Sequence, residues 1–283
     1  MIRFGPSGNS ESFYAAGYKS TWQSPAWLSA MGLSAYEYSF GRGVQLSREG
    51  AEKIAGEAKK HGIALSVHAP YFINLANPDP EKRENSFRYI LESAQAADWL
   101  GADRVVVHVG AMMKMEKEEA LQNCRNGILE ALKRLDDAGL SHIHLCPETM
   151  GKKNQIGDLK ETLDFCQLDE RLIPCLDFAH IHALHQGALS GPEDFERVLD
   201  QMESAIGIER AREMHVHFST IEFTAAGEKR HRTFAEENYG PRFEHLAPLL
   251  KARDYAPRII CESKGTMAED AKAMMEIFQS VSA

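Results

Sequence analysis

Short apolar segments alternate along the whole chain with longer segments of helical periodicity. Most of the short segments are rich in Val, Ile and Leu without strict polar alternation, which is typical of parallel strands buried on both faces. Eight of them follow one another, at residues 2–6, 35–40, 64–68, 104–108, 142–148, 173–177, 213–217 and 258–262. In the longer segments, such as 49–61, 117–138 and 267–281, apolar residues recur three or four positions apart. The pattern therefore predicts eight strand–helix units.

Eight strand–helix units in 283 residues predict an α/β fold, a (β/α)8 TIM barrel that forms a single domain over residues 1–283. No Pro- or Ser-rich linker and no change in composition divides the chain. A doubly wound open sheet is the second choice, but it calls for a Gly-rich phosphate-binding turn after the first strand. Gly5-Pro6-Ser7-Gly8 resembles such a turn only loosely. In barrels of this kind the chemistry lies at the C-terminal ends of the strands.

The composition is that of a soluble globular protein, with 43% hydrophobic and 26% charged residues. No apolar segment is long enough to span a membrane, and the N-terminus lacks the apolar run of a signal peptide, so we expect a cytoplasmic protein. The five cysteines include no Cys-x-x-Cys pair, which favours reduced thiols over disulfides or a zinc ribbon. The net charge of −9 argues against a general nucleic-acid binder, although bound divalent cations would offset part of it.

Side chains that commonly bind metal ions stand at the ends of six successive predicted strands or shortly after them. They are His68, His108, Glu148, Asp177, His180, His215, His217, Glu262 and, in the loop between the last two strands, His231. Any one of them alone fits a hydrogen-bonded core residue. Three carboxylates gathered in a barrel, however, would each be costly to bury unless cations compensated for their charge. Imidazole and carboxylate ligands without thiolates favour zinc or manganese over iron–sulfur clusters or copper.

The chain resembles the endonuclease IV family of DNA-repair apurinic/apyrimidinic (AP) endonucleases, and the resemblance runs through nearly its whole length. Short motifs carry it by their order and spacing: His68-Ala-Pro-Tyr71-Phe72-Ile73-Asn74-Leu75, Val107-His108-Val109-Gly110, Glu148-Thr149, Leu176-Asp177-x-x-His180, Met214-His215, Arg230-His231 and Cys261-Glu262-Ser263. The resemblance implies a (β/α)8 barrel that holds three zinc ions. It also implies a substrate, duplex DNA containing abasic sites.

The resemblance implies a set of ligands for each of three ions. They are His68 and His108 for the first ion, Asp177, His215 and Glu262 for the second, Glu148 as a bridge between these two, and His180 and His231 for the third. We therefore expect two to three zinc ions, with manganese as the alternative. The implied reaction is cleavage of DNA on the 5′ side of the abasic site. In it, water between the first two ions attacks phosphorus while the third stabilises the leaving 3′-oxygen. Glu148 is the residue expected to be catalytic.

The resemblance also implies a DNA contact in the loop after the third strand. In the family, side chains of this loop press into the duplex where the base is missing, and Tyr71 and Phe72 match those positions. Packing in the core beneath the loop is the alternative that the residues alone leave open. Nothing in the sequence implies a protein partner, and we expect a monomer.

The chain departs from the family pattern at three places: the family's Gly-rich run after the loop histidine is poor here, at residues 235–240, and two departures concern candidate ligands. The family has an Asp two residues before the loop histidine, in an Asp-Arg-His run, whereas this chain has Lys229 there. Glu228 could replace that Asp with a shift of one residue; otherwise the third site is weak or empty, and we expect its ion to bind least tightly. The family also continues its seventh strand as His-x-Asn-Asp, where this chain has His215-Val216-His217-Phe218. His217 is then either an extra ligand or a replacement for the amide.

Two other functions remain open from the sequence. A sugar isomerase or epimerase of the xylose-isomerase-like barrels would bind one metal ion through Glu148, Asp177, His215 and Glu262. The acidic charge and Lys229 favour this alternative, but it leaves the other four histidines unexplained. A metal-dependent binding protein without catalysis is the third hypothesis. It would bind metal without turning over any substrate.

Overall fold

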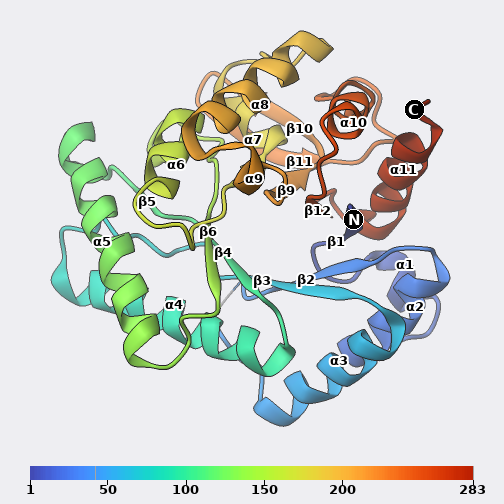
Figure 1. Ribbon diagram of the computed structural model, residues 1–283, viewed down its shortest axis with the longest axis horizontal. Coiled ribbons are helices and arrows are strands. Elements are labelled where there is room, and N and C mark those ends of the chain that lie inside the picture. Colours follow the sequence, from blue (N-terminus) through green and yellow to red (C-terminus); the bar gives the residue numbers. More distant parts are fainter. Residues whose placement is uncertain (42, 283) are drawn as a thin grey trace.

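A ring of eight parallel strands lies at the centre of the computed structural model, which describes residues 1–41 and 43–282 (Figure 1). The barrel strands are β1 (Arg3–Pro6), β2 (Ala35–Ser39), β3 (Ala64–His68), β4 (Arg104–Val107), β6 (His144–Pro147), β8 (Cys175–Asp177), β9 (His215–Phe218) and β12 (Arg258–Cys261). They pair in two runs, β1-β12-β9-β8 and β2-β3-β4-β6. Single bridges between Ser7 and Glu37 and between Glu148 and Cys175 join the runs into a closed barrel. The predicted (β/α)8 barrel is confirmed.

Helices surround the barrel on its outer side (Figure 1). They are α1 (Glu11–Ala15), α2 (Ser24–Ala30), α3 (Arg48–His61), α4 (Pro80–Leu100), α5 (Lys117–Asp137), α6 (Leu159–Cys166), α7 (Phe178–Leu184), α8 (Pro192–Ile206), α9 (Ile208–Ala211), α10 (Phe243–Ala252) and α11 (Met267–Ser280), with a 3-10 turn at Thr21–Gln23. Helix α3 shows why they form where they do. The Ser47 side chain accepts a hydrogen bond from the backbone N–H of Gly50, and the helix ends at Gly62, whose φ of 69° suits glycine. Within the described part of the chain no helix has the length and apolarity to cross a membrane.

Side chains that point into the barrel form layers, because successive residues of a strand face opposite sides. Val106, Cys146 and Cys175 form a small, fully buried apolar layer inside the barrel. Cys146 and Cys175 lie two residues before Glu148 and Asp177, so these carboxylates lie in the layer above, towards the C-terminal strand ends. The alternation of side chains along each strand thus places small apolar side chains beneath these carboxylates.

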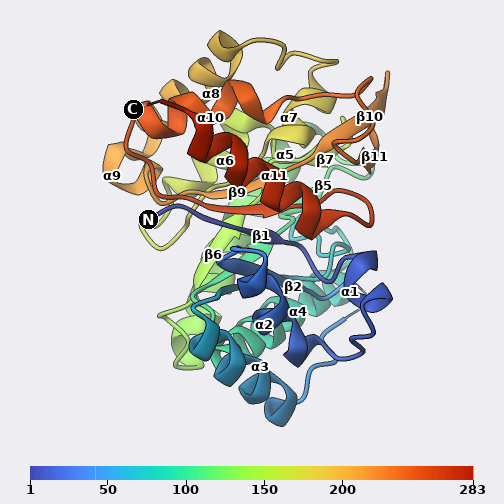
Figure 2. The same cartoon turned by 90° about the vertical axis from the view of Figure 1, so that its right-hand side faces the viewer.

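Two antiparallel strand pairs, which no local pattern in the sequence predicts, extend the loops at the C-terminal end of the barrel. Strand β5 (Gly110–Ala111) pairs with β7 (Gln155–Ile156), and β10 (Thr220–Thr224) pairs with β11 (Gly227–Arg232). Figure 2 shows all four on the side away from the N-terminus. They build the wall around the strand ends.

Candidate metal centre

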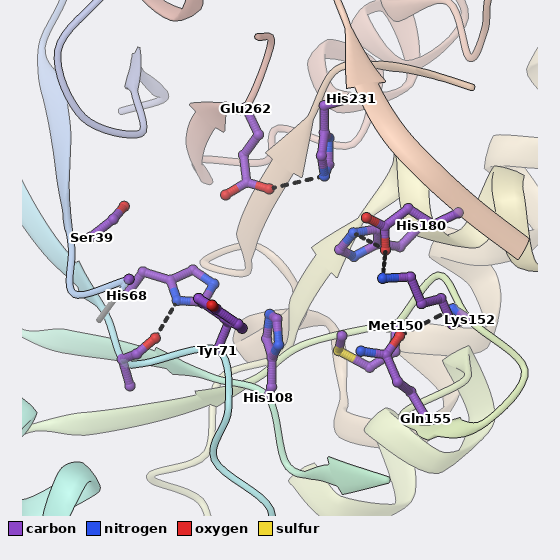
Figure 3. A pocket seen from close by; sticks show the side chains of 13 residues that line it. Ser39, His68, Tyr71, His108, Met150, Lys152, Gln155, His180, His231 and Glu262 are labelled. Carbon is purple, nitrogen blue, oxygen red and sulfur yellow. Dashed lines mark hydrogen bonds and ion pairs between the residues drawn. The ribbon is translucent and has the colours of Figure 1, made fainter. Parts of the chain in front are cut away.

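Histidines and carboxylates from the strand ends surround one cavity of about 320 Å3, shown from close by in Figure 3. His68 is the last residue of β3, and His108, Glu148 and Glu262 each directly follow the last residue of their strands. Parallel barrel strands end at a common rim, so residues at corresponding positions converge even though they are far apart in sequence.

The first group of side chains consists of His68, His108 and Glu148. Nε2 of His68 lies 3.2 Å from Oε2 of Glu148, and Nε2 of His108 lies 2.9 Å from the same oxygen. The carboxylate of Glu148 is fully buried. These are the residues expected around the first ion, and the structure brings them together.

The second group consists of Glu148, Asp177, His217 and Glu262, whose ligand atoms lie within 4.8 Å of one another. Nδ1 of His217 is 3.0 Å from Oε1 of Glu148 and 3.6 Å from Oε1 of Glu262. Glu148 therefore turns one oxygen towards each group, Oε2 to the first and Oε1 to the second. This is the arrangement that a bridging carboxylate requires.

His217, and not His215, occupies the place in this group that the resemblance assigned to His215. The reason is the register between β8 and β9, which pairs Asp177 with His217 and Cys175 with His215. His215 thus lies one layer deeper, where its Nε2 is 3.0 Å from Oε2 of Glu37 and burial lowers its pKa to about 4. The expectation for His215 was wrong by two residues.

The third group consists of Asp177, His180 and His231, whose ligand atoms also lie within 4.8 Å of one another. His180 belongs to α7, which begins directly after Asp177, and Oδ1 of Asp177 accepts a hydrogen bond from the backbone N–H of His180. His231 comes from strand β11 of the hairpin, and its Nε2 lies 3.8 Å from Oε2 of Glu262. The two histidines expected around the third ion are therefore adjacent.

A β-bulge in the β10–β11 hairpin brings Glu228 to this third group and turns Lys229 away from it. The pairing shifts by one residue between Glu222 and Phe223, which leaves Lys229 as the extra residue of β11. Oε2 of Glu228 lies 3.5 Å from Nε2 of His180, whereas Nζ of Lys229 lies 2.6 Å from Oε1 of Glu222. Of the two alternatives that the sequence left open, this geometry favours Glu228, with a shift of one residue, over Lys229 in the place of the missing carboxylate.

The close approach of the hairpin to the loop after β6 depends on Gly227. Its φ is 101°, and a Cβ atom there would lie 2.1 Å from the carbonyl oxygen of Gly151. That carbonyl accepts a hydrogen bond of 2.8 Å from the backbone N–H of Glu228. Glycine at position 227 thus allows the backbone contact that places Glu228 beside His180.

Three of the histidines have one ring nitrogen held by a partner and the other facing the cluster. Nδ1 of His68 is 2.7 Å from the carbonyl oxygen of the next residue, and Nδ1 of His180 is 2.9 Å from the carbonyl oxygen of Thr149. Nδ1 of His231 is 2.7 Å from Oγ of Ser219. Such partners fix the orientation of the ring and leave the lone pair of Nε2 available to a metal ion. Metal-binding histidines are usually held in this way.

The buried carboxylates of the cluster favour positively charged groups next to them. Burial lowers the pKa of His68, but the hydrogen bond and charge of Glu148 outweigh it and raise that pKa to about 9. Burial likewise opposes protonation of His180, yet Asp177 and Glu228 raise its pKa to about 9. The pKa of Asp177 itself is raised, chiefly by burial. The site therefore attracts cations, whether protons or metal ions.

The donor set fits divalent metal ions. Within the described residues, Oδ2 of Asp177 is buried without a hydrogen-bond partner and lies 3.3 Å from Nδ1 of His180. An unpartnered buried carboxylate oxygen is costly unless a cation meets it. The nitrogen and oxygen donors of these three groups suit zinc or manganese. Cys175 belongs to the layer below, where its Sγ lies within 4.8 Å of ring nitrogens of His215 and His217.

Tyr71 and Phe72 lie at the edge of the centre and are exposed by 62% and 46%. Tyr71 lines the cavity, and the ring of Phe72 packs edge-on against Tyr89 with centroids 5.0 Å apart. Neither side chain packs in the core, which was the alternative that the sequence left open.

Two residues of the centre were missed from the sequence. Glu37 is a fully buried carboxylate in the middle of β2. Its signal was a charged residue in an otherwise uncharged strand, Ala-Tyr-Glu-Tyr-Ser. Ser219 holds His231, and it stands two residues after His217, where the family motif His-x-Asn-Asp has its Asn. Placing the motif on His217 instead of His215 would have found it.

Relatives of known sequence are similar to this chain over most of its length. The chain is 34% identical over 256 residues to the uncharacterized protein MJ0133 of Methanocaldococcus jannaschii, with 90% of each chain covered. It is 28% identical over 252 residues to the probable endonuclease 4 of Shouchella clausii, with 85% of this chain and 80% of that one covered.

Solved structures of two kinds share the fold. Endonuclease IV from Thermus thermophilus superposes with a TM-score of 0.70 at 22% identity, covering 98% of both chains. A D-tagatose 3-epimerase-like protein superposes with a TM-score of 0.69 at 18% identity, covering 98% of this chain and 96% of that one. At such identities the likeness concerns the fold. Residues 25–281 match the model of one family, so the chain belongs to the xylose isomerase-like TIM barrels, with endonuclease IV proteins among its relatives.

Proposed function

We propose that the protein is a metal-dependent phosphodiester hydrolase that cleaves duplex DNA on the 5′ side of abasic sites. Within the described residues the candidate ligand side chains form five overlapping groups, and the observation that carries the proposal is that three of these adjoin one another and include nearly all the expected ligands. A single ion would need only the second group. The pair His68 and His108 and the set His180, His231 and Glu228 lie outside it, and two or three ions account for both.

Each group supplies ligands for one ion. We assign His68, His108 and one oxygen of Glu148 to the first ion, the other oxygen of Glu148 with Asp177, His217 and Glu262 to the second, and His180, His231 and Glu228 to the third. Zinc or manganese ions held this way would lower the pKa of a water molecule, screen the charge of a phosphodiester and stabilise the departing oxygen. Glu148 fixes the spacing of the first two sites because its two oxygens face different groups.

The rim of the cavity suits a nucleic-acid backbone despite the acidic net charge. Lys152 lines the cavity with its Nζ 3.8 Å from Oε2 of Glu228, and the loop of residues 149–157 contains a second lysine and no acid. Cations there would meet phosphates, which supply much of the affinity of proteins for DNA. The exposed rings of Tyr71 and Phe72 stand beside the cavity, where they can stack on bases next to a gap in the duplex.

A single-metal sugar epimerase is the second candidate, and one observation favours it. Glu148, Asp177, His217 and Glu262 form a complete four-ligand group, and the cavity beside it is large enough for a monosaccharide. This candidate leaves the first and third groups without a role. It predicts one bound ion and turnover of ketohexoses.

The proposal is tested with a synthetic duplex that carries one tetrahydrofuran abasic analogue, using protein purified without chelator and then loaded with zinc. We expect a nick on the 5′ side that leaves a 3′-hydroxyl, no cleavage of the intact duplex, and loss of nicking after chelation. Glu148→Gln removes one charge from the shared carboxylate and should reduce the rate by several orders of magnitude.

The matched control is His142→Ala, because His142 is an exposed histidine paired with Asp98 away from the cavity and should be dispensable. If fully loaded protein leaves the abasic duplex intact but epimerises a ketohexose, the second candidate replaces the first.

A further inference from the structure

Glu37 is a buried carboxylate beneath the metal centre that none of the three ligand groups includes. It lies in the middle of β2, is fully buried, and points into the barrel beside Ser66 and the two histidines of β9. Oγ of Ser66 donates a hydrogen bond of 2.9 Å to its Oε2, and Nε2 of His215 lies 3.0 Å from the same oxygen. Its Oε1 lies 2.9 Å from Nε2 of His217.

Packing alone does not explain why a carboxylate is buried at this depth. Much of the neighbouring layer is the apolar set Val106, Cys146 and Cys175, and an uncharged side chain at position 37 would avoid the cost of burying an ion there. Ser66 donates a hydrogen bond to Glu37, while Nε2 of His215 and Nε2 of His217 lie within 3.0 Å of its oxygens without hydrogen-bond alignment. His217 is also a residue of the second ligand group. Glu37 is thus coupled to the centre through His217.

The two ring nitrogens of His217 face in different directions. Nδ1 faces Oε1 of Glu148 at 3.0 Å, and Nε2 faces Glu37. A neutral imidazole has one N–H, so a proton on Nε2 leaves the lone pair of Nδ1 for a metal ion. His68, His180 and His231 have the opposite arrangement, with Nδ1 held and Nε2 facing the cluster.

We propose that Glu37 is a positioning residue that accepts the Nε2 proton of His217 and so presents Nδ1 to the second metal ion. Nε2 of His217 and Oε1 of Glu37 lie 2.9 Å apart and are both buried, but they are not aligned as a hydrogen bond and neither atom has another hydrogen-bond partner among the described residues. The proposed bond therefore requires a small rotation of the imidazole ring or of the carboxylate. A carboxylate partner also makes the imidazole a stronger ligand than a neutral carbonyl partner does. The inference rests on the proposed metal site but not on the identity of the substrate.

The test is the variant Glu37→Gln, which keeps the size of the side chain and removes its charge. Zinc affinity is measured by chelator competition, and we expect one ion per chain to bind about 10- to 100-fold more weakly while the others are unchanged. In the cobalt-loaded protein, the visible absorption of that one site should change. Ser66→Ala is the matched control, since it removes another donor to Glu37 without touching His217, and it should preserve both readouts.

A second measurement needs no variant. Long-range 1H–15N NMR of the zinc-loaded protein should show His217 protonated at Nε2 and bare at Nδ1. A proton on Nδ1, or a Glu37→Gln protein with unchanged affinities and an unchanged cobalt spectrum, would overturn the proposal even if folding stability fell. Because neither measurement uses DNA, failure to nick an abasic duplex would refute the proposed function and leave this inference standing.

Discussion

At the scale of single residues, Glu148 is the side chain on which the first two ligand groups converge. It directly follows β6, the apolar Cys146 lies two residues below it on the same strand, and both of its carboxylate oxygens face histidines. Burial would raise the pKa of Glu148, but the charges of His108 and His217 hold it well below its usual range. The residue is therefore ionised and available to two groups at once.

His217→Asn and His215→Asn separate the two histidines of β9. His217→Asn removes a ligand of the second group, and we expect loss of one bound ion and a fall in hydrolysis by a factor on the order of 10² or more, beyond the effect typical of residues that only support a ligand. His215→Asn lies one layer deeper and should keep the full ion count. Elemental analysis of both variants checks this, and ion loss confined to the His215 variant would restore the original assignment.

Metal binding should strengthen as the pH rises towards 9. His68 and His180 have pKa values raised from 6.5 to about 9, so in the metal-free protein their protonation stabilises the fold fully below about 6.5 and less as the pH rises through 9. Each must lose its proton to bind an ion, which predicts about a tenfold gain in affinity per pH unit for the first and third ions. Competition titrations with a chelator of known pH dependence measure it. Affinities that stay constant between pH 6.5 and 8.5 would contradict the account.

At the scale of elements, short irregular segments on the barrel decide which side chains meet. The bulge in β11 places Glu228 and His231 on one side of the hairpin although they are three residues apart, while Lys229 and Arg230 pair with Glu222 on the other. The loop after β3 similarly exposes Tyr71 and Phe72 instead of burying them.

Glu228→Gln should weaken the third ion, and Lys229→Gln should not. Glu228 lies 3.5 Å from His180, so loss of its charge should reduce the affinity of that ion by about 10- to 100-fold, whereas Lys229 is bound to Glu222 outside the cavity. Chelator titration of both variants gives the order of ion release. A tighter third ion in the Lys229 variant would show that its ammonium group acts on the site after all.

Tyr71→Ala combined with Phe72→Ala should weaken binding to an abasic duplex without removing any ion. Stacking of a base on an aromatic ring contributes about 1–3 kcal/mol, so we expect roughly a tenfold loss or more for the pair. Fluorescence anisotropy with labelled duplexes measures it, and an equal loss on intact duplex would mean that the rings do not sense the missing base.

The regular elements could be predicted from the sequence, and the irregular ones could not. Each predicted barrel segment overlaps its strand, because buried parallel strands have a strong apolar signal. β9, however, spans His215–Phe218, so it ends one residue beyond the predicted 213–217, and without the register to β8 the motif was placed on the wrong histidine. A bulge depends on pairing between distant residues, so the position of Glu228 had no local signal. Glu37 had a local signal, since it is a charged residue in an otherwise uncharged strand. The sequence alone, however, does not show which residues surround it in the closed barrel.

At the scale of the whole molecule, the closed barrel converts six separate strand ends into one acidic and histidine-rich centre. The net charge of −9 includes the carboxylates of this centre, and bound divalent ions would offset part of it. The fold itself serves both endonucleases and sugar epimerases. The choice between these functions therefore rests on how many ions the centre holds.

The metal content of the purified protein tests this central claim most directly. Elemental analysis of protein prepared without chelator, related to chain concentration, counts the ions per chain. Three ligand groups predict two to three equivalents of zinc or manganese. A single equivalent that no added metal increases would contradict the account, because the first and third groups would then be ordinary buried polar residues around a one-ion site.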